Sequence, residues 1–122
     1  MIIIRTDHDI ITHYLYHWSD ELIKLCKDRG VAIADITGDN ISNDNVKKRM
    51  EKHNFIFFNG HGSKDALFDN KQKVFFDIKD VKSFKDKIVY ARACDCLIGL
   101  GKSSVKNGCL SFIGYKNKFI LP

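Results

Sequence analysis

Two continuous apolar runs constrain the fold of this chain more than any other feature of its sequence. Residues 55–58 and 88–91 consist entirely of hydrophobic residue types. Runs of this kind are typical of strands that are buried on both faces of a parallel sheet. Small and polar residues follow each run at once, at 59–63 and at 92–96. We therefore expect these two polar segments at the carboxyl ends of buried strands.

The size and charge of the chain exclude several classes of protein. Its 122 residues leave room for one domain, 1–122. The net charge of +5 is too mild to indicate a nucleic-acid partner. No apolar run reaches the ~18 residues of a membrane helix, and Arg5 interrupts the apolar start too early for a secretory signal. Four cysteines in such a chain are expected to be thiols in a reducing compartment, so we expect a cytoplasmic protein without a membrane partner.

Strand-like and helix-like segments alternate along the sequence. The pattern predicts strands near residues 2–5, 31–36, 55–58, 88–92 and 110–114, helices near 9–29, 42–53, 78–84 and 97–107, and a hairpin from 66–68 and 74–76. Asp9 or Thr12 is expected to cap the first helix, and Gly30 to end it. This order predicts an α/β fold, a three-layer sandwich with a mainly parallel central sheet flanked by helices.

The residues at two of the expected strand ends suit nucleophilic catalysis. His61 stands between two glycines after the first apolar run, where a substrate backbone can approach closely. Cys94 follows the second run and precedes a predicted helix, whose positive N-terminal end favours a thiolate. A histidine base beside a cysteine can generate that nucleophile. Taken alone, either segment is equally well explained as a tight turn or a buried thiol.

The two blocks together resemble the signature of the caspase-like cysteine peptidases, clan CD. The matching segments are Phe55-Ile56-Phe57-Phe58-Asn59-Gly60-His61-Gly62 and Ile88-Val89-Tyr90-Ala91-Arg92-Ala93-Cys94. In that family a hydrophobic strand ends in His-Gly, and a later one ends in Ala-Cys. Residues 108–115 are similar to the segment after the nucleophile in gingipain-like and CHAT-like bacterial members. The resemblance covers residues 50–116.

The resemblance implies a cysteine endopeptidase that acts through an acyl-thioester intermediate. It makes His61 the general base and Cys94 the nucleophile, with the backbone N–H groups of Gly62 and Cys94 as the oxyanion hole. The family uses a Cys-His dyad, without a required third member, and no metal or other cofactor. The expected partner is a protein or peptide substrate.

Arg92 stands two residues before the nucleophile, a position that lines the substrate pocket in several relatives. A guanidinium there favours an acidic or a polar side chain before the cut. The alternative is a structural ion pair with Asp95 or another carboxylate. Complete members have a sixth strand and further loops, whereas 28 residues follow Cys94 here. The chain is therefore expected to be a fragment, a processed large subunit, or a minimal form whose pocket a second chain completes.

Several other readings stay open at this point. Cys96 is a second thiol near Cys94, and a metal site from these two cysteines and His61 has the weak Cys-x-Cys spacing. His13 and His17 have the i, i+4 spacing of a metal pair, although a solvated helix face is the simpler interpretation.

Two other functions compete with peptidase activity. One is a non-catalytic caspase-like interaction or regulatory module. The other is a response-regulator-like or nucleotide-binding module, but no phosphate-binding glycine loop follows the first strand.

Overall fold

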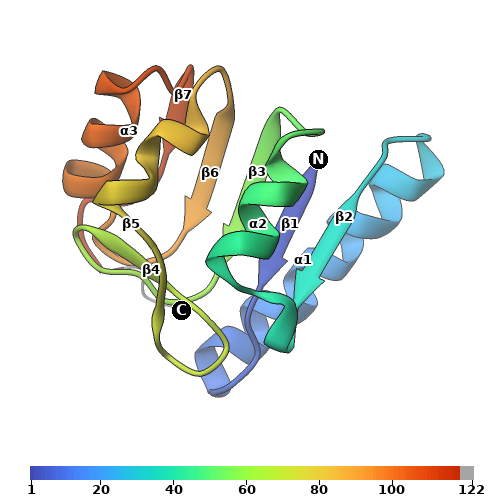
Figure 1. Cartoon of the computed structure of the whole chain (residues 1–122). Helices are drawn as coiled ribbons and strands as arrows, with labels where there is room; N and C mark the ends of the chain where they lie inside the picture. Colours follow the sequence, from blue (N-terminus) through green and yellow to red (C-terminus); the bar gives the residue numbers. More distant parts are fainter. Residues whose placement is uncertain (119–122) are drawn as a thin grey trace.

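The computed structural model describes residues 1–118, which form a parallel sheet with helices on both faces (Figure 1). The strands are β1 (Ile2–Arg5), β2 (Ala34–Thr37), β3 (Phe55–Asn59), β4 (Ala66–Phe68), β5 (Val74–Asp77), β6 (Ile88–Arg92) and β7 (Ser111–Ile113). The helices are α1 (Ile10–Asp28), α2 (Asn43–Met50) and α3 (Lys102–Lys106), with short helices η1 (Gly38–Asn40), η2 (Ile78–Phe84) and η3 (Leu97–Gly101).

Five strands form the central sheet in the order β2-β1-β3-β6-β7, and all neighbouring pairs are parallel. β4 and β5 form a separate antiparallel hairpin. The predicted α/β class, the parallel sheet and the hairpin are thus confirmed. The carboxyl ends of strands β3 and β6 lie side by side, because their last residues, Asn59 and Arg92, are paired in register.

One face of the sheet carries the apolar core. Alternate residues of every strand point to this face, where α2, η2 and η3 cover them. The strand residues of this core include Ile4, Ile36, Phe58, Ala91 and Phe112. α1 covers the other face, where buried Ile3 packs and where Arg5 bonds to the helix. Helices on both faces explain why the runs at 55–58 and 88–91 contain no polar residue.

α1 begins with a reciprocal capping box. The Asp9 side chain accepts a hydrogen bond from the Thr12 amide, and the Thr12 hydroxyl accepts one from the Asp9 amide. Both residues expected as caps therefore act together. Gly30 follows the helix with a φ of +71°, a left-handed conformation that glycine adopts without strain.

Several predicted boundaries are wrong in detail. The second strand starts at Ala34 rather than at Val31, because the Val31 amide bonds to the Cys26 carbonyl and closes the end of α1. The helix predicted at 42–53 ends at Met50. The helix predicted at 97–107 begins as a π-helical turn, η3, and continues as α3. Within residues 1–118, no helix is both long and apolar enough to cross a membrane.

Candidate active site

His61 and Cys94 follow neighbouring strands, at the same edge of the sheet. β3 ends at Asn59 and β6 at Arg92, so each functional residue stands two positions beyond its strand. The chain stays paired past the strand ends, because the Gly60 amide donates to the Arg92 carbonyl over 3.4 Å. The parallel register therefore brings the two predicted catalytic segments together.

Gly62 lies directly against the cysteine segment. A Cβ atom built on Gly62 would be 3.0 Å from the Ala93 Cβ and 3.2 Å from the Cys94 carbonyl oxygen. A side chain at this position would require these neighbours to shift by a few tenths of an ångström. The glycine after His61 thus fits the close approach of the loop carrying Cys94.

The amide of Gly62 is directed away from the hairpin. Gly62 and Leu67 form an antiparallel bridge in which the flanking amides of Ser63 and Phe68 donate the hydrogen bonds. In a bridge of this geometry, the central residue's own N–H points outward from the pair. This orientation suits the oxyanion-hole role expected of Gly62.

Asp9 forms a close hydrogen bond with the candidate base. Its Oδ2 atom lies 2.6 Å from His61 Nε2, and the two side chains are 38% and 32% exposed. Its Oδ1 atom accepts from the Thr12 amide and hydroxyl, both over 2.8 Å. The helix cap therefore fixes the carboxylate, and the carboxylate in turn fixes the imidazole ring. This leaves Nδ1 as the nitrogen available to a thiol.

The same contacts keep Asp9 ionised. Partial burial alone would raise the pKa of its carboxyl, but hydrogen bonds from the Thr12 amide, from His61 and from the Thr12 hydroxyl outweigh it. The pKa of Asp9 is lowered to about 2. An ionised Asp9 can only accept a hydrogen bond, so a neutral His61 ring carries its hydrogen on Nε2, donates it to Asp9 and offers Nδ1 as an acceptor.

The backbone around Cys94 has an uncommon conformation. Cys94 is partly buried, and Asp95 directly after it adopts a φ of +62°. Left-handed backbone in a residue other than glycine often marks a functional site. The Asp95 amide donates to the Asn117 carbonyl, and η3 begins at Leu97 with a π-helical turn. Such turns are also frequent at functional sites.

The other three thiols are less suited to catalysis. Cys96 belongs to the apolar core with no exposed surface, and burial raises its pKa to about 11. Burial also raises the pKa of Cys109, and Cys26 is buried. A thiol held protonated in a core is a poor nucleophile. Cys94 is thus the thiol best placed to react, and a metal site that includes Cys96 and His61 does not fit this packing.

Arg92 lies on the α1 side of the sheet. Its Nε donates to the Asn59 side chain over 2.8 Å, and its guanidinium lies 5.6 Å from the Trp18 ring and 5.5 Å from the Phe57 ring. Burial lowers the pKa of Arg92, and within residues 1–118 no carboxylate forms an ion pair with it. The structural ion pair with Asp95 is therefore not formed.

Arg92 also lines a cavity of about 340 Å³ with His17, Trp18 and Glu21. A half-buried guanidinium with spare N–H donors beside a cavity is suited to bind an anion.

Sequence reasoning missed two residues of the candidate site. The sequence pattern points to Asp9 only as a helix cap and does not point to His8. Both follow β1, which pairs with β3, so they lie at the same sheet edge as His61. Their place after a strand was the available signal. A position after β1 indicates a site residue only because β1 lies beside β3, and this adjacency depends on the strand order of the folded sheet.

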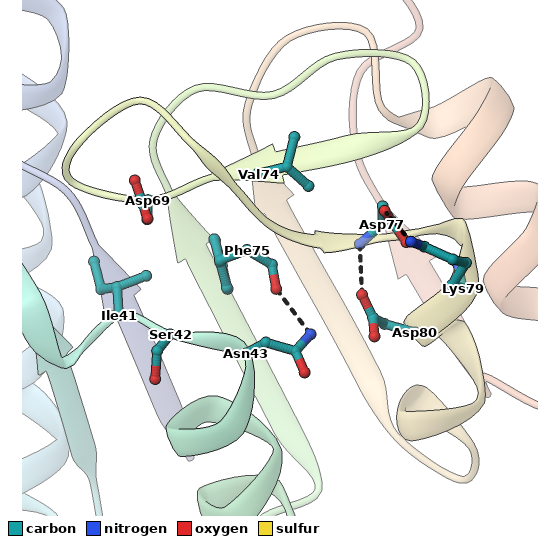
Figure 2. A pocket seen from close by; sticks show the side chains of 9 residues that line it. All are labelled: Ile41, Ser42, Asn43, Asp69, Val74, Phe75, Asp77, Lys79 and Asp80. Carbon is teal, nitrogen blue, oxygen red and sulfur yellow. Dashed lines mark hydrogen bonds and ion pairs between the residues drawn. The ribbon is translucent and has the colours of Figure 1, made fainter.

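A different hollow, of about 440 Å³, lies between the start of α2 and the β4–β5 hairpin (Figure 2). Its polar side chains bond within the fold. Asn43 donates to the Phe75 carbonyl, Asp80 accepts from the Asp77 amide, and Lys47 forms an ion pair with Asp80. Neither histidine nor cysteine is among its lining residues, so it offers no counterpart of the His61 and Cys94 pair.

Comparisons with known proteins add no identification. No protein-family model matches the sequence, and no curated protein matches it.

Proposed function

We propose that this chain is a caspase-like cysteine endopeptidase that uses Cys94 as nucleophile and His61 as general base. The main support is one arrangement: His61, oriented by Asp9, lies on the loop whose Gly62 contacts the Ala93-Cys94 backbone. The strand order and the helices on both faces are consistent with the three-layer sandwich of that family. The reaction class follows from the chemistry of these side chains.

The reaction would proceed in two halves. Nδ1 of His61 takes the Cys94 proton, and the thiolate attacks the peptide carbonyl carbon. The N–H groups of Gly62 and Cys94 would stabilise the oxyanion of the tetrahedral intermediate. His61 then returns the proton to the leaving amine, which gives the acyl-thioester. Water, deprotonated by His61, attacks the thioester, releases the acid and restores the thiol.

Asp9 is assigned a positioning role in this reaction. Its carboxylate holds the ring in the tautomer that presents Nδ1, and it stabilises the imidazolium formed when the thiol is deprotonated. The site would thus be a Cys-His-Asp arrangement rather than a bare dyad.

We assign Arg92 to binding the substrate side chain that precedes the cleaved bond. The guanidinium is held by Asn59 and the aromatic rings, and it faces a cavity. A substrate Asp or Glu would supply the missing carboxylate partner. Cleavage is therefore expected to be faster after Asp or Glu than after Lys. Arg92→Ala should remove that preference, at a cost of about 2–5 kcal/mol in transition-state binding.

The matched control for this residue is Arg92→Lys, which keeps the charge but loses the planar fork. It should retain part of the preference for acidic residues. Equal cleavage after acidic, neutral and basic residues by the unmodified chain would contradict this assignment.

A second candidate is a non-catalytic interaction module. Ile88 and Ile113, on neighbouring strands β6 and β7, are 37% and 48% exposed on the α1 side of the sheet. Apolar side chains exposed on adjacent strands favour contact with another chain. The same surface suits the second chain that would complete the specificity pocket.

Labelling with an electrophilic peptide probe separates the two candidates. A peptidase should be labelled at Cys94, and His61→Ala should slow labelling by on the order of 100-fold. Cys94→Ser should abolish labelling, whereas Cys96→Ser and His13→Ala serve as matched controls and should leave it unchanged. The peptidase proposal would be contradicted if the probe labelled Cys94 no faster than a free thiol, both in the unmodified chain and in His61→Ala.

A further inference from the structure

Three side chains with metal-binding atoms meet beside the α1 N-terminus. His8 follows β1, Asp9 caps α1, and His61 follows β3. One ligand atom from each residue lies within 4.8 Å of the other two. The pairing of β1 with β3 explains why residues so far apart in the sequence come together.

His8 is the member of this cluster that lacks a partner. Its side chain is only 9% exposed, and both ring nitrogens are buried without a hydrogen bond. Leaving buried polar atoms unpaired costs about 1–3 kcal/mol, so folded proteins rarely do it. Asp9 Oδ2 lies 3.8 Å from His8 Nδ1. That distance is too long for a hydrogen bond and leaves the ring nitrogen facing the carboxylate.

Asp9 is already oriented as a metal ligand would be. Its Oδ1 is held by Thr12, so Oδ2 points toward both imidazole rings. Hydrogen bonds to the second oxygen commonly orient carboxylates at metal sites. A cavity of about 660 Å³, lined in part by His8 and Asp9, gives solvent access to the cluster.

We propose that His8, Asp9 and His61 form a site for a divalent transition metal such as Zn²⁺, with water as the fourth ligand. Two imidazoles and one carboxylate with an open position are a common catalytic or regulatory zinc set, and imidazole disfavours Mg²⁺ and Ca²⁺. Tetrahedral ligands about 2.0–2.1 Å from the ion lie about 3.3 Å apart. The present separations of 2.6 and 3.8 Å from Oδ2 bracket that value, so small side-chain shifts suffice.

Metal binding would replace the proton that His61 shares with Asp9. The ion would take Nε2, and the remaining ring proton would then reside on Nδ1. A ring in that state donates at Nδ1 and cannot accept a proton from Cys94. This consequence rests on the proposed peptidase function: the metal would switch the enzyme off by occupying its base.

The test is titration of the purified chain with Zn²⁺ by calorimetry, in a Cys94→Ser background that removes the nearby thiol. We expect one ion per chain. His8→Phe, which keeps a ring in the buried site, should weaken binding at least 100-fold, and so should Asp9→Asn, which retains the helix cap. His13→Ala is the matched control, because Asp7, His13 and His17 form a separate exposed cluster. It should leave the affinity unchanged.

Binding of Co²⁺ to the same Cys94→Ser chain provides a second measurement, the visible absorption spectrum, which needs no variant of His8 or Asp9. The visible spectrum should show the intense bands of a tetrahedral nitrogen and oxygen site. The proposal would be overturned if the chain did not bind one metal ion stoichiometrically. A thiolate charge-transfer band in the Co²⁺ spectrum would also overturn it, because it would place a cysteine among the ligands. So would metal binding that is lost in His13→Ala but kept in His8→Phe. Each outcome is independent of Cys94 labelling in the unmodified chain, so the metal site and the peptidase function can fail separately.

Discussion

Asp9 uses its two carboxylate oxygens for different purposes, and two substitutions can separate them. Oδ1 caps α1 through Thr12, whereas Oδ2 holds His61. Asp9→Ala removes both interactions. Asp9→Asn keeps an oxygen that can cap the helix, because asparagine is as good an N-cap as aspartate, but it removes the charge beside His61.

The stability difference between the two variants should equal the value of the cap. Replacing an N-cap by alanine costs about 1–2 kcal/mol, which corresponds to a fall in Tm of roughly 4–8 °C for a chain of this size. Asp9→Asn keeps the cap and should lose only what the charge contributes, about 1 kcal/mol at neutral pH. Urea unfolding at neutral pH, monitored by circular dichroism, measures the free energy of unfolding of both variants.

The charge should show itself in the pH dependence. The pKa of Asp9 is about 2 in the folded chain, below its ordinary value of 3.8, so the carboxylate stabilises the fold fully above about pH 4. That contribution is lost as the pH falls from 4 toward 2. A shift of this size corresponds to ~2.4 kcal/mol, which solvent screening of a carboxylate 38% exposed reduces to about 1 kcal/mol. The stability gap between the unmodified chain and Asp9→Asn should therefore close over this interval.

The effect on His61 should be larger than the effect on stability. An asparagine amide would donate to Nε2, which forces the ring hydrogen onto Nδ1 and removes the acceptor that the proposed base needs. Cys94 labelling should fall by on the order of 100-fold or more in Asp9→Asn. Two results would refute the reasoning: a gap between the unmodified chain and Asp9→Asn that persists at pH 2, or unchanged labelling in a folded Asp9→Asn chain.

Three further substitutions test the packing around the site, with unfolding free energy measured in urea. Gly99→Ala should cost about 1–3 kcal/mol, because its Cβ would overlap the Lys64 carbonyl; a neutral effect would mean that the loop after His61 is not held against η3. Phe58→Ala should cost about 3–5 kcal/mol, since this side chain is fully buried in the core, and a loss below 1 kcal/mol would contradict that packing. Cys96→Ser should cost about 1–3 kcal/mol by burying a hydroxyl, yet leave Cys94 labelling unchanged; slower labelling at equal folding would implicate Cys96 in the chemistry.

The sheet was predictable because its central strands carry apolar residues on both faces, although only the face toward the core is fully buried and Ile88 on the α1 side is 37% exposed. A segment such as 55–58 has no polar residue to place in water, which leaves few alternatives to a central parallel strand. The boundaries were less predictable. Val31 is as hydrophobic as a strand residue, yet it is 46% exposed because the turn after α1 uses its amide. Local hydrogen bonding decided where the strand could begin.

The candidate site was predictable only in part, for a related reason. His61 and Cys94 stand in recognisable blocks, so pattern alone brings them to notice. Asp9 and His8 belong to no such block, and their value comes from β1 lying beside β3. Arg92 was placed at the right sheet edge, but its contacts with Asn59, Trp18 and Phe57 involve side chains from three elements. Contacts of that kind depend on the packed structure.

A buried polar row connects these observations. Arg5, Asn59 and Arg92 are the last residues of β1, β3 and β6, and they are paired in register across the sheet. Asn59 and Arg5 are buried on the α1 side, where apolar side chains would pack more simply. Their hydrogen bonds instead reach the helix: Asn59 donates to the Leu15 carbonyl, and Arg5 donates to the Tyr16 carbonyl.

Such a row fixes the position of α1 along the sheet, because directional bonds to backbone carbonyls leave little freedom to slide. Asp9 caps that helix, so its distance from His61 depends on where the helix lies. A purely apolar interface would hold α1 with comparable strength but with less precise register. The polar residues at the strand ends therefore serve the site as positioning elements, and they do so one residue layer below the chemistry proposed for His61 and Cys94.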